Sequence, residues 1–191
     1  MQVRFTTCFI AAFACAATLS LAGCGTPDHI DLAGLKLGMT QAEVKAAAPA
    51  GAALYCRGDG DTAFDQVSGL PESTTLRFCT WTAADSSTGQ RTFAQVQIGS
   101  DTSSKVQLVF DYAGNSLQSV GIEVLNNAYD RILKTFTDKF GSPDSSSLGM
   151  SMPMLGGAHW DAKYDTLTIS VDDMHPYMTN VMLIAKPAKT N

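Results

Sequence analysis

Thioether and imidazole side chains gather in the last third of the chain, and they are the groups best suited to chemistry there. Six of the eight methionines lie between residues 150 and 182. Thioether sulfur and imidazole nitrogen are good ligands for Cu(I). Met150, Met152, Met154 and His159 therefore form a candidate copper site. Methionine also fills irregular gaps in cores and makes adaptable contacts with partners, and we expect one of these two roles ahead of metal binding.

The segment 144–157 around these methionines lacks the period of a helix or a strand, yet it is rich in apolar side chains. These are Leu148, Met150, Met152, Met154 and Leu155. Exposed apolar groups that cluster on a surface mark interaction sites. We therefore predict that Met150, Met152 and Met154, with the nearby Trp160, contact a protein partner. No cofactor is predicted.

Carboxylates beside a histidine are the other candidate for chemistry. Asp172, Asp173 and His175 could perform acid–base work, but aspartates in a solvated turn are the more common reason for such a cluster. The chain has no G-x-S-x-G and no H-E-x-x-H sequence. We therefore predict no catalytic residues and a non-enzymatic protein. A hydrolase whose active site the sequence does not reveal is a further alternative.

Asp59, Asp61 and Asp65 are spaced like the first ligands of a calcium-binding loop. That loop requires glycine at its sixth position and glutamate at its twelfth. Phe64 and Leu70 occupy these positions, so the calcium interpretation is rejected.

The N-terminus has the pattern of an export signal. Arg4 is the only charged residue before an apolar stretch at 8–22, which is shorter than the roughly 20 residues that span a bilayer. The stretch ends in Leu21-Ala22-Gly23-Cys24, which resembles the lipobox of bacterial lipoproteins. The resemblance implies cleavage before Cys24 and acylation of that cysteine. An ordinary cleaved signal peptide is the alternative. Gly25, in place of the Asp that retains some lipoproteins at the inner membrane, favours the outer membrane, facing the periplasm.

The remaining cysteines support export. Cys8 and Cys15 would leave with the signal peptide, and Cys24 would carry lipid. Cys56 and Cys79 remain, an even pair in an oxidising compartment, and we predict a disulfide between them. Two free buried thiols are the alternative.

The predicted mature chain is acidic and of single-domain size. Removal of residues 1–23 would leave 168 residues, with 12 basic and 18 acidic side chains and a net charge of −6. The basic residues do not cluster, which argues against a nucleic-acid partner. We predict a tether at 24–36 and one domain at 37–191.

Helix signals occur twice in this domain. Thr40 and Glu43 form a capping box before a helix that we expect at 41–48. A second helix is expected at 128–140, where apolar residues recur at helical spacing.

Strand-like alternation fills most of the remaining chain. Strands are expected at 53–57, 74–81, 93–98, 106–112, 117–125, 158–163, 167–171 and 178–185, with a hairpin between 106–112 and 117–125. The predicted class is α+β, with helices packed on an antiparallel sheet. The order of helices and strands suggests two repeats, 37–125 and 126–191.

Two short patches carry a family resemblance. The helix start Leu37-Gly38-Met39-Thr40-Gln41-Ala42-Glu43-Val44 and the helix end Phe140-Gly141-Ser142-Pro143 resemble the SmpA/OmlA (BamE-type) outer-membrane lipoproteins and the domains similar to β-lactamase-inhibitor protein. The resemblance implies an envelope location and helices packed on an antiparallel sheet. The expected function is a lipid-anchored protein-binding module, either an assembly accessory or an inhibitor of an envelope enzyme. A copper-binding envelope protein is the alternative.

Lipidation can be tested directly. Cys24→Ala removes the only thiol that the lipobox offers for acylation, so the variant should lose its acyl mass and leave the membrane fraction. Intact-mass analysis of the wild-type protein should show a chain that begins at Cys24 and carries added lipid. A processed wild-type chain without acyl mass would contradict the assignment.

Overall fold

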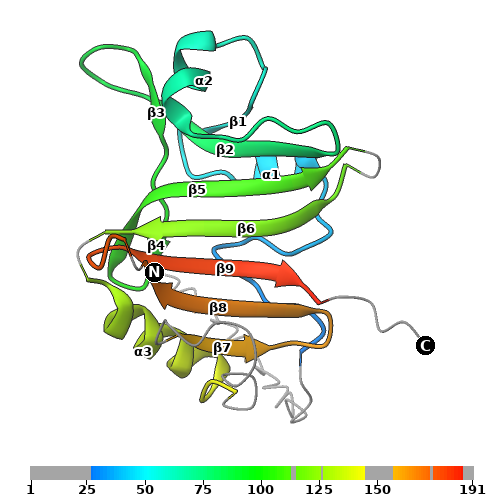
Figure 1. The fold of residues 1–191 in the computed structure, drawn as a ribbon, viewed down its shortest axis with the longest axis vertical. Helices are drawn as coiled ribbons and strands as arrows, with labels where there is room; N and C mark the ends of the chain where they lie inside the picture. Colours follow the sequence, from blue (N-terminus) through cyan, green and yellow to red (C-terminus); the bar gives the residue numbers. More distant parts are fainter. Residues whose placement is uncertain (1–26, 113–114, 126, 145–156, 173, 187–191) are drawn as a thin grey trace, which may run out of the picture.

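The computed structural model describes residues 27–112, 115–125, 127–144, 157–172 and 174–186. The predicted signal peptide and the methionines of 150–154 lie outside these ranges. Within them the chain forms one twisted antiparallel sheet with three short helices (Figure 1).

The strands follow one another along the chain with few helices between them. They are β1 (Ala53–Cys56), β2 (Leu76–Ala84), β3 (Arg91–Phe93), β4 (Gln97–Ile98), β5 (Asp101–Asp111), β6 (Leu117–Val124), β7 (Ala158–Asp161), β8 (Asp165–Val171) and β9 (Thr179–Ala185). The helices are α1 (Gln41–Ala46), α2 (Thr62–Ser68) and α3 (Tyr129–Phe140).

The predicted α+β class is wrong. The described helices have 6, 7 and 12 residues against nine strands, so the fold is β-rich. Part of the error lies in β5, which begins at Asp101, five residues before the predicted strand. Residues 101–105 are polar and give no apolar alternation, but pairing with β4 and β6 holds them extended.

The sheet order is β1-β2-β5-β6-β9-β8-β7, with β3 beside β2 and β4 beside β5. The strands β1, β2, β5 and β6 follow one another from one edge of the sheet toward its middle, and β7, β8 and β9 do so from the other edge. The last strands of the two groups, β6 and β9, therefore pair in the middle. The expected hairpin is confirmed as β5–β6. The last two strands, β8 and β9, are also antiparallel partners. The repeat bounds at 37–125 and 126–191 stay a prediction.

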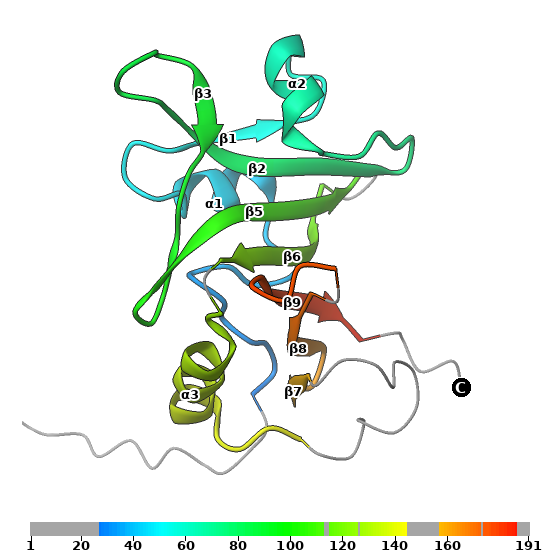
Figure 2. The same cartoon turned by 60° about the vertical axis from the view of Figure 1, so that its left-hand side comes forward.

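One face of this sheet carries the main core. Figure 2 shows α1, α3 and the segment before α1 on the same side of the sheet. Their buried side chains join alternate residues of the central strands in one cluster. Its members include Ile30, Leu32, Leu35, Val44, Ile132, Phe136, Val106, Leu108, Val120, Ile122, Val181 and Leu183.

The start of α1 is fixed by its capping box, as predicted. The Thr40 hydroxyl accepts the Glu43 N–H, and the Glu43 carboxylate accepts the Thr40 N–H. Each contact satisfies a backbone donor that a helix start leaves without an intrahelical partner. The helix ends at Ala46, two residues before the predicted end.

A tryptophan from the sheet holds the C-terminal end of each of the two core helices. The Trp81 indole N–H donates to the carbonyl of Val44 in α1 at 3.3 Å, and the Trp160 indole N–H donates to the carbonyl of Gly141, after α3, at 2.8 Å. These carbonyls belong to helix ends, where intrahelical donors run out. Trp81 and Trp160 are 0% and 3% exposed, so each also fills the core beneath its helix.

The helix α2 lies within 58–71, a segment outside every helix and strand that the sequence predicted. Asp61 caps its start by accepting the Phe64 N–H at 3.0 Å, and Gly69 ends it in the left-handed conformation. The helix packs on the opposite face of the sheet, where Phe64 and Leu70 form a small second core with Tyr55.

The predicted disulfide is present. Cys56 and Cys79 are direct partners across β1 and β2, and their sulfurs are bonded. The bridge ties the edge strand β1 to β2 across a sequence separation of 23 residues.

Removal of this bridge should lower stability without changing the fold. A Cys56→Ala/Cys79→Ala variant frees a loop of this length in the unfolded chain, and we expect a loss of about 2–4 kcal/mol. Urea denaturation of both proteins, followed by circular dichroism, measures the difference. Equal midpoints for the two proteins would show that the bridge adds nothing to stability.

Candidate binding site on the open face of the sheet

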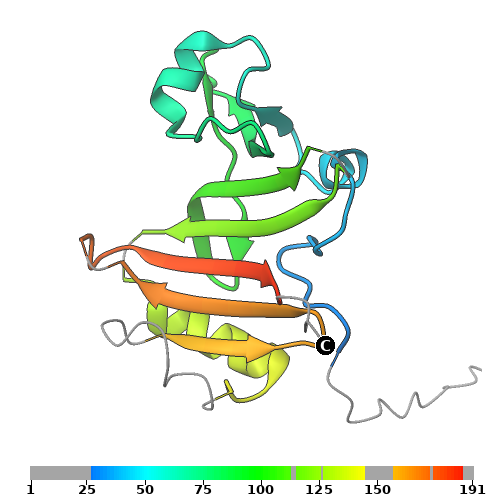
Figure 3. The same cartoon turned by 45° about the vertical axis from the view of Figure 1, so that its right-hand side comes forward.

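Four central strands present one face that no described helix covers. In Figure 3 this face lies in front, formed by β5, β6, β9 and β8 in green, light green, red and orange, with α3 behind them. On these strands alternate residues enter the core, so the residues between them face outward. We call this surface the open face.

Strand register arranges the open face in three rows. The first row runs Thr166, Ile184, Ser119, Val109; the second runs Thr168, Met182, Gly121, Gln107; the third runs Ser170, Asn180, Glu123, Lys105. Lys105 and Glu123 stand opposite each other at one corner and are the only charged members of the three rows. The open face is thus electrically neutral, and half of its twelve residues carry hydroxyl or amide side chains.

A shallow depression of about 210 Å³ lies near the centre of the open face. Gly121 forms part of its floor because glycine has no side chain there. Met182 lies beside it and is 45% exposed, and Ile184, in the next row, is 40% exposed. Two large apolar groups beside a hollow offer the contacts that a protein partner uses.

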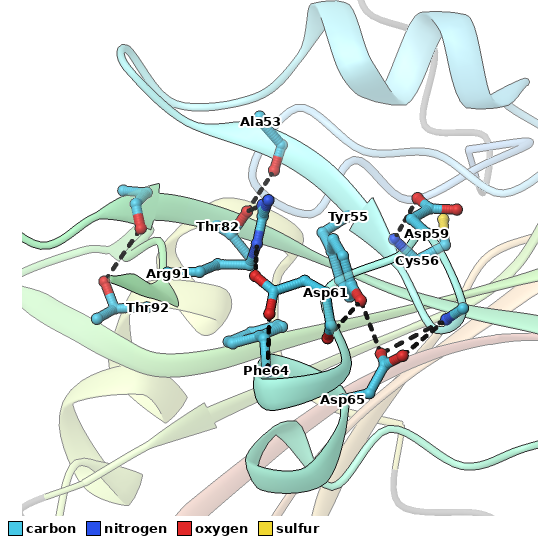
Figure 4. A network of polar contacts seen from close by, with 12 residues as sticks. Ala53, Tyr55, Cys56, Asp59, Asp61, Phe64, Asp65, Thr82, Arg91 and Thr92 are labelled. Carbon is cyan, nitrogen blue, oxygen red and sulfur yellow. Dashed lines mark hydrogen bonds and ion pairs between the residues drawn. The ribbon is translucent and has the colours of Figure 1, made fainter. Parts of the chain in front are cut away.

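Figure 4 shows a second candidate, a polar network between α2 and β1–β3. The Tyr55 hydroxyl donates to the Asp65 carboxylate at 2.8 Å. The Arg91 guanidinium lies 4.6 Å from the centre of the Tyr55 ring, and it donates to Asp61 at 3.0 Å and to the Thr82 hydroxyl at 2.9 Å.

Protonation states in this network favour a structural role. Burial, followed by the hydrogen bond to Asp65, raises the pKa of Tyr55 to about 12, so the phenol stays neutral at physiological pH. The Phe64 N–H and then Arg91 lower the pKa of Asp61, which stays ionised. A neutral phenol and a paired carboxylate offer no general base, and together they fasten α2 to the sheet.

The two arginines at the other end of β1 and β2 are likewise paired. Arg57 donates to Glu72 at 2.7 Å, and Arg77 donates to Asp59 at 2.6 Å, beside a hollow of about 430 Å³. Because each guanidinium already faces a carboxylate, the hollow carries little net positive charge for an anionic ligand. Asp59, Asp61 and Asp65 each serve a different partner, in keeping with the rejection of a calcium loop.

The residues predicted to bind a partner or copper are only partly described. Met150, Met152 and Met154 lie outside the described residues. His159 and Trp160 are in β7, 7% and 3% exposed. Trp160 packs edge-on against Phe136, so it is a core residue and not the exposed contact that was predicted.

The aspartate–histidine cluster forms a turn, the interpretation that the sequence favoured over acid–base work. The Asp172 carboxylate accepts the N–H groups of Met174 and His175 at 2.9 and 2.8 Å. These bonds, that of His175 first, lower the pKa of Asp172. Asp173 lies outside the described residues. In the described part of the chain, no three His, Cys, Asp or Glu side chains gather as a metal site would require.

Sequence reasoning missed the open face, although one signal for it was present. In β9 the inward residues Thr179, Val181 and Leu183 alternate with Asn180, Met182 and Ile184. Large apolar residues at two outward positions are unusual for a strand whose second face meets solvent. That pattern could have pointed to a contact surface.

Comparison of the chain with protein-family models, curated proteins and solved structures finds no match. None of the helices in the described ranges is long and apolar enough to cross a membrane.

The structural role of Tyr55 predicts how stability depends on pH. Since the pKa of Tyr55 is about 12 in the folded chain and about 10 when unfolded, its contribution is complete below pH 10 and is lost as pH rises toward 12. Tyr55→Phe cannot ionise, so the variant should lose less stability than the wild type over this range. Urea denaturation of both proteins at about pH 9 and about pH 11, on either side of the unfolded pKa, measures how far the free energy of unfolding of each one falls between these pH values. An equal fall in the wild type and in Tyr55→Phe would contradict the assignment.

Proposed function

We propose that this chain is a lipid-anchored envelope protein that binds another envelope protein through the open face of its sheet, without catalysis. The observation that carries the proposal is the open face itself, a neutral surface on which Met182 lines the depression at Gly121 and Ile184 is exposed in the next row. The Leu21–Cys24 pattern supports the anchor. The disulfide supports export, because such bonds persist in oxidising compartments.

The chemistry of the open face favours a folded protein as the partner. Nucleic acid and anionic lipid surfaces require clusters of Lys and Arg, and here one lysine stands opposite one glutamate. Hydroxyl and amide groups supply hydrogen bonds, and a thioether adapts its shape to the surface that it meets. A neutral partner surface with an apolar projection that fits the depression is the best complement.

The partner would be an envelope protein, either one whose assembly the lipoprotein assists or an enzyme that it inhibits. Gly25 supports an outer-membrane location facing the periplasm. Copper binding through Met150, Met152, Met154 and His159 stays an alternative prediction of the sequence. It is not the leading proposal because no contact among the described residues favours it.

A substitution at Gly121 tests the open face. Its backbone does not require glycine, and an added Cβ would lie 3.9 Å from the Cβ of Gln107, an ordinary contact. Gly121→Trp should therefore fold, fill the depression and reduce partner binding by about tenfold or more, the effect of losing a central contact. Photo-crosslinking from position 182 in intact envelopes, with mass-spectrometric identification of the adduct, provides the binding measurement.

Met174 supplies the matched control. It lies in the turn between β8 and β9, is 85% exposed and is not part of the open face. A crosslinker at 174 should give little of the adduct obtained at 182, and Met174→Trp should leave that adduct unchanged. Equal adducts at both positions, or none at 182, would refute the proposal. A crosslink between two copies of this chain would show that the open face mediates self-association and would refute a separate partner.

A further inference from the structure

The segment that follows Cys24 is fixed to one end of the sheet. The carbonyl of Pro27 accepts the Lys163 N–H at 2.9 Å, and the carbonyl of Asp28 accepts the Tyr164 N–H at 3.2 Å. Residues 27 and 28 therefore lie against the turn between β7 and β8.

A buried carboxylate strengthens this attachment. Asp165, the first residue of β8, is 1% exposed. It accepts the Ile30 N–H at 3.1 Å and lies 2.9 Å from Nδ1 of His29. Hydrogen bonds to a buried carboxylate are strong and directional, so residues 27–30 are held in one position on the sheet.

The attachment limits where the lipid can be. Cys24 precedes Pro27 by three residues, and an extended chain spans at most about 3.6 Å per residue. The acylated cysteine must therefore lie within about 11 Å of Pro27. A bilayer that holds this lipid must then come close to the β7–β8 turn.

The side chains at this end of the sheet suit a bilayer surface. Lys163 and Tyr164 are exposed, and with Lys186 they line a hollow of about 560 Å³ whose walls include Leu37 and Leu117. Tyrosine favours the headgroup level of a bilayer, and lysine places its ammonium among phosphates while its stem covers apolar surface.

We propose that this end of the sheet, which we call the anchor end, docks on the phospholipid headgroups of the membrane that holds Cys24. Lys163 is exposed and lies 3.6 Å from the equally exposed Asp28, a loose pair that it can exchange for a headgroup phosphate, and Tyr164 lies at the level of the headgroups. Lys186 stays paired with Asp161 at 3.2 Å and donates to the carbonyl of Ala162. This inference rests on the lipid anchor of the proposed function. Its consequence is that the strands lead away from the bilayer and the open face points to the side, where a neighbouring protein can reach it.

Two single-cysteine variants test the orientation. The mature protein has Cys24 acylated and Cys56 bonded to Cys79, so one introduced cysteine can carry a fluorophore. Gln118→Cys places it at the rim of the hollow, and Met174→Cys places it at the other end of the seven-residue strand β8, about 20 Å away. In Figure 1 the β7–β8 turn and the β8–β9 turn lie at opposite ends of the strands.

The lipidated proteins are inserted in vesicles of phosphatidylethanolamine and phosphatidylglycerol that contain a lipid with a nitroxide headgroup. The fluorophore at 118 should lose its emission and the one at 174 should keep it. Asp165→Asn should restore emission at 118 while the acyl mass stays unchanged. His29→Ala, at a partly exposed position, gives the same test if the Asp165→Asn variant does not fold.

Acylated protein whose two labels respond equally, or in which the 174 label responds more, overturns the orientation and leaves the anchor in place. If the fluorophore at 118 stays quenched in both Asp165→Asn and His29→Ala, then Asp165 does not set the orientation. Protein without acyl mass overturns the anchor itself, and with it this inference, so the two failures are distinguishable.

Discussion

Burial of one face of the sheet is the constraint on which the structure depends. A wide antiparallel sheet needs a covered face to form a core, and this chain has only two short helices and an N-terminal segment on that side in the ranges that the structure describes. Trp81 and Trp160 meet the constraint twice, because each fills the space beneath a helix and donates a hydrogen bond to its C-terminal end. The remaining helix, α2, covers the other face only at its β1–β3 end. The rest of that face, on β5, β6, β9 and β8, has no helix over it in the described ranges and forms the open face.

The parts of the fold that were predicted correctly have local causes. The Thr40–Glu43 capping box, the β5–β6 hairpin and the Cys56–Cys79 bridge each rest on residue types at fixed spacing. The fold class was wrong because pairing with neighbouring strands decides the structure of polar segments such as 101–105. The helix α2 was missed although Asp61 and Gly69 mark its ends, since its seven residues give too short an apolar period.

The candidate site was harder to predict than the fold. Trp160 was expected on a partner-binding surface, and only the packing of α3 shows that its side chain is buried. Gly121 and Met182 are 61 residues apart in the sequence, and the β6–β9 register alone makes them neighbours. Because four strands contribute to this face, the sequence pattern of each strand alone indicates it only weakly. Here that pattern is the outward placement of Met182 and Ile184 in β9. The anchor, by contrast, depends on adjacent residues, so the sequence alone can suggest it.

The central claim is that a protein partner covers the open face in the cell envelope. Met182 lies on this face and Met174 lies outside it, and both are accessible in the isolated chain. Oxidative footprinting of intact envelopes, with the purified protein as reference, measures how far each methionine is protected. We expect Met182 to be protected in envelopes while Met174 reacts as it does in the purified protein. Equal reactivity of Met182 in both preparations would contradict the account.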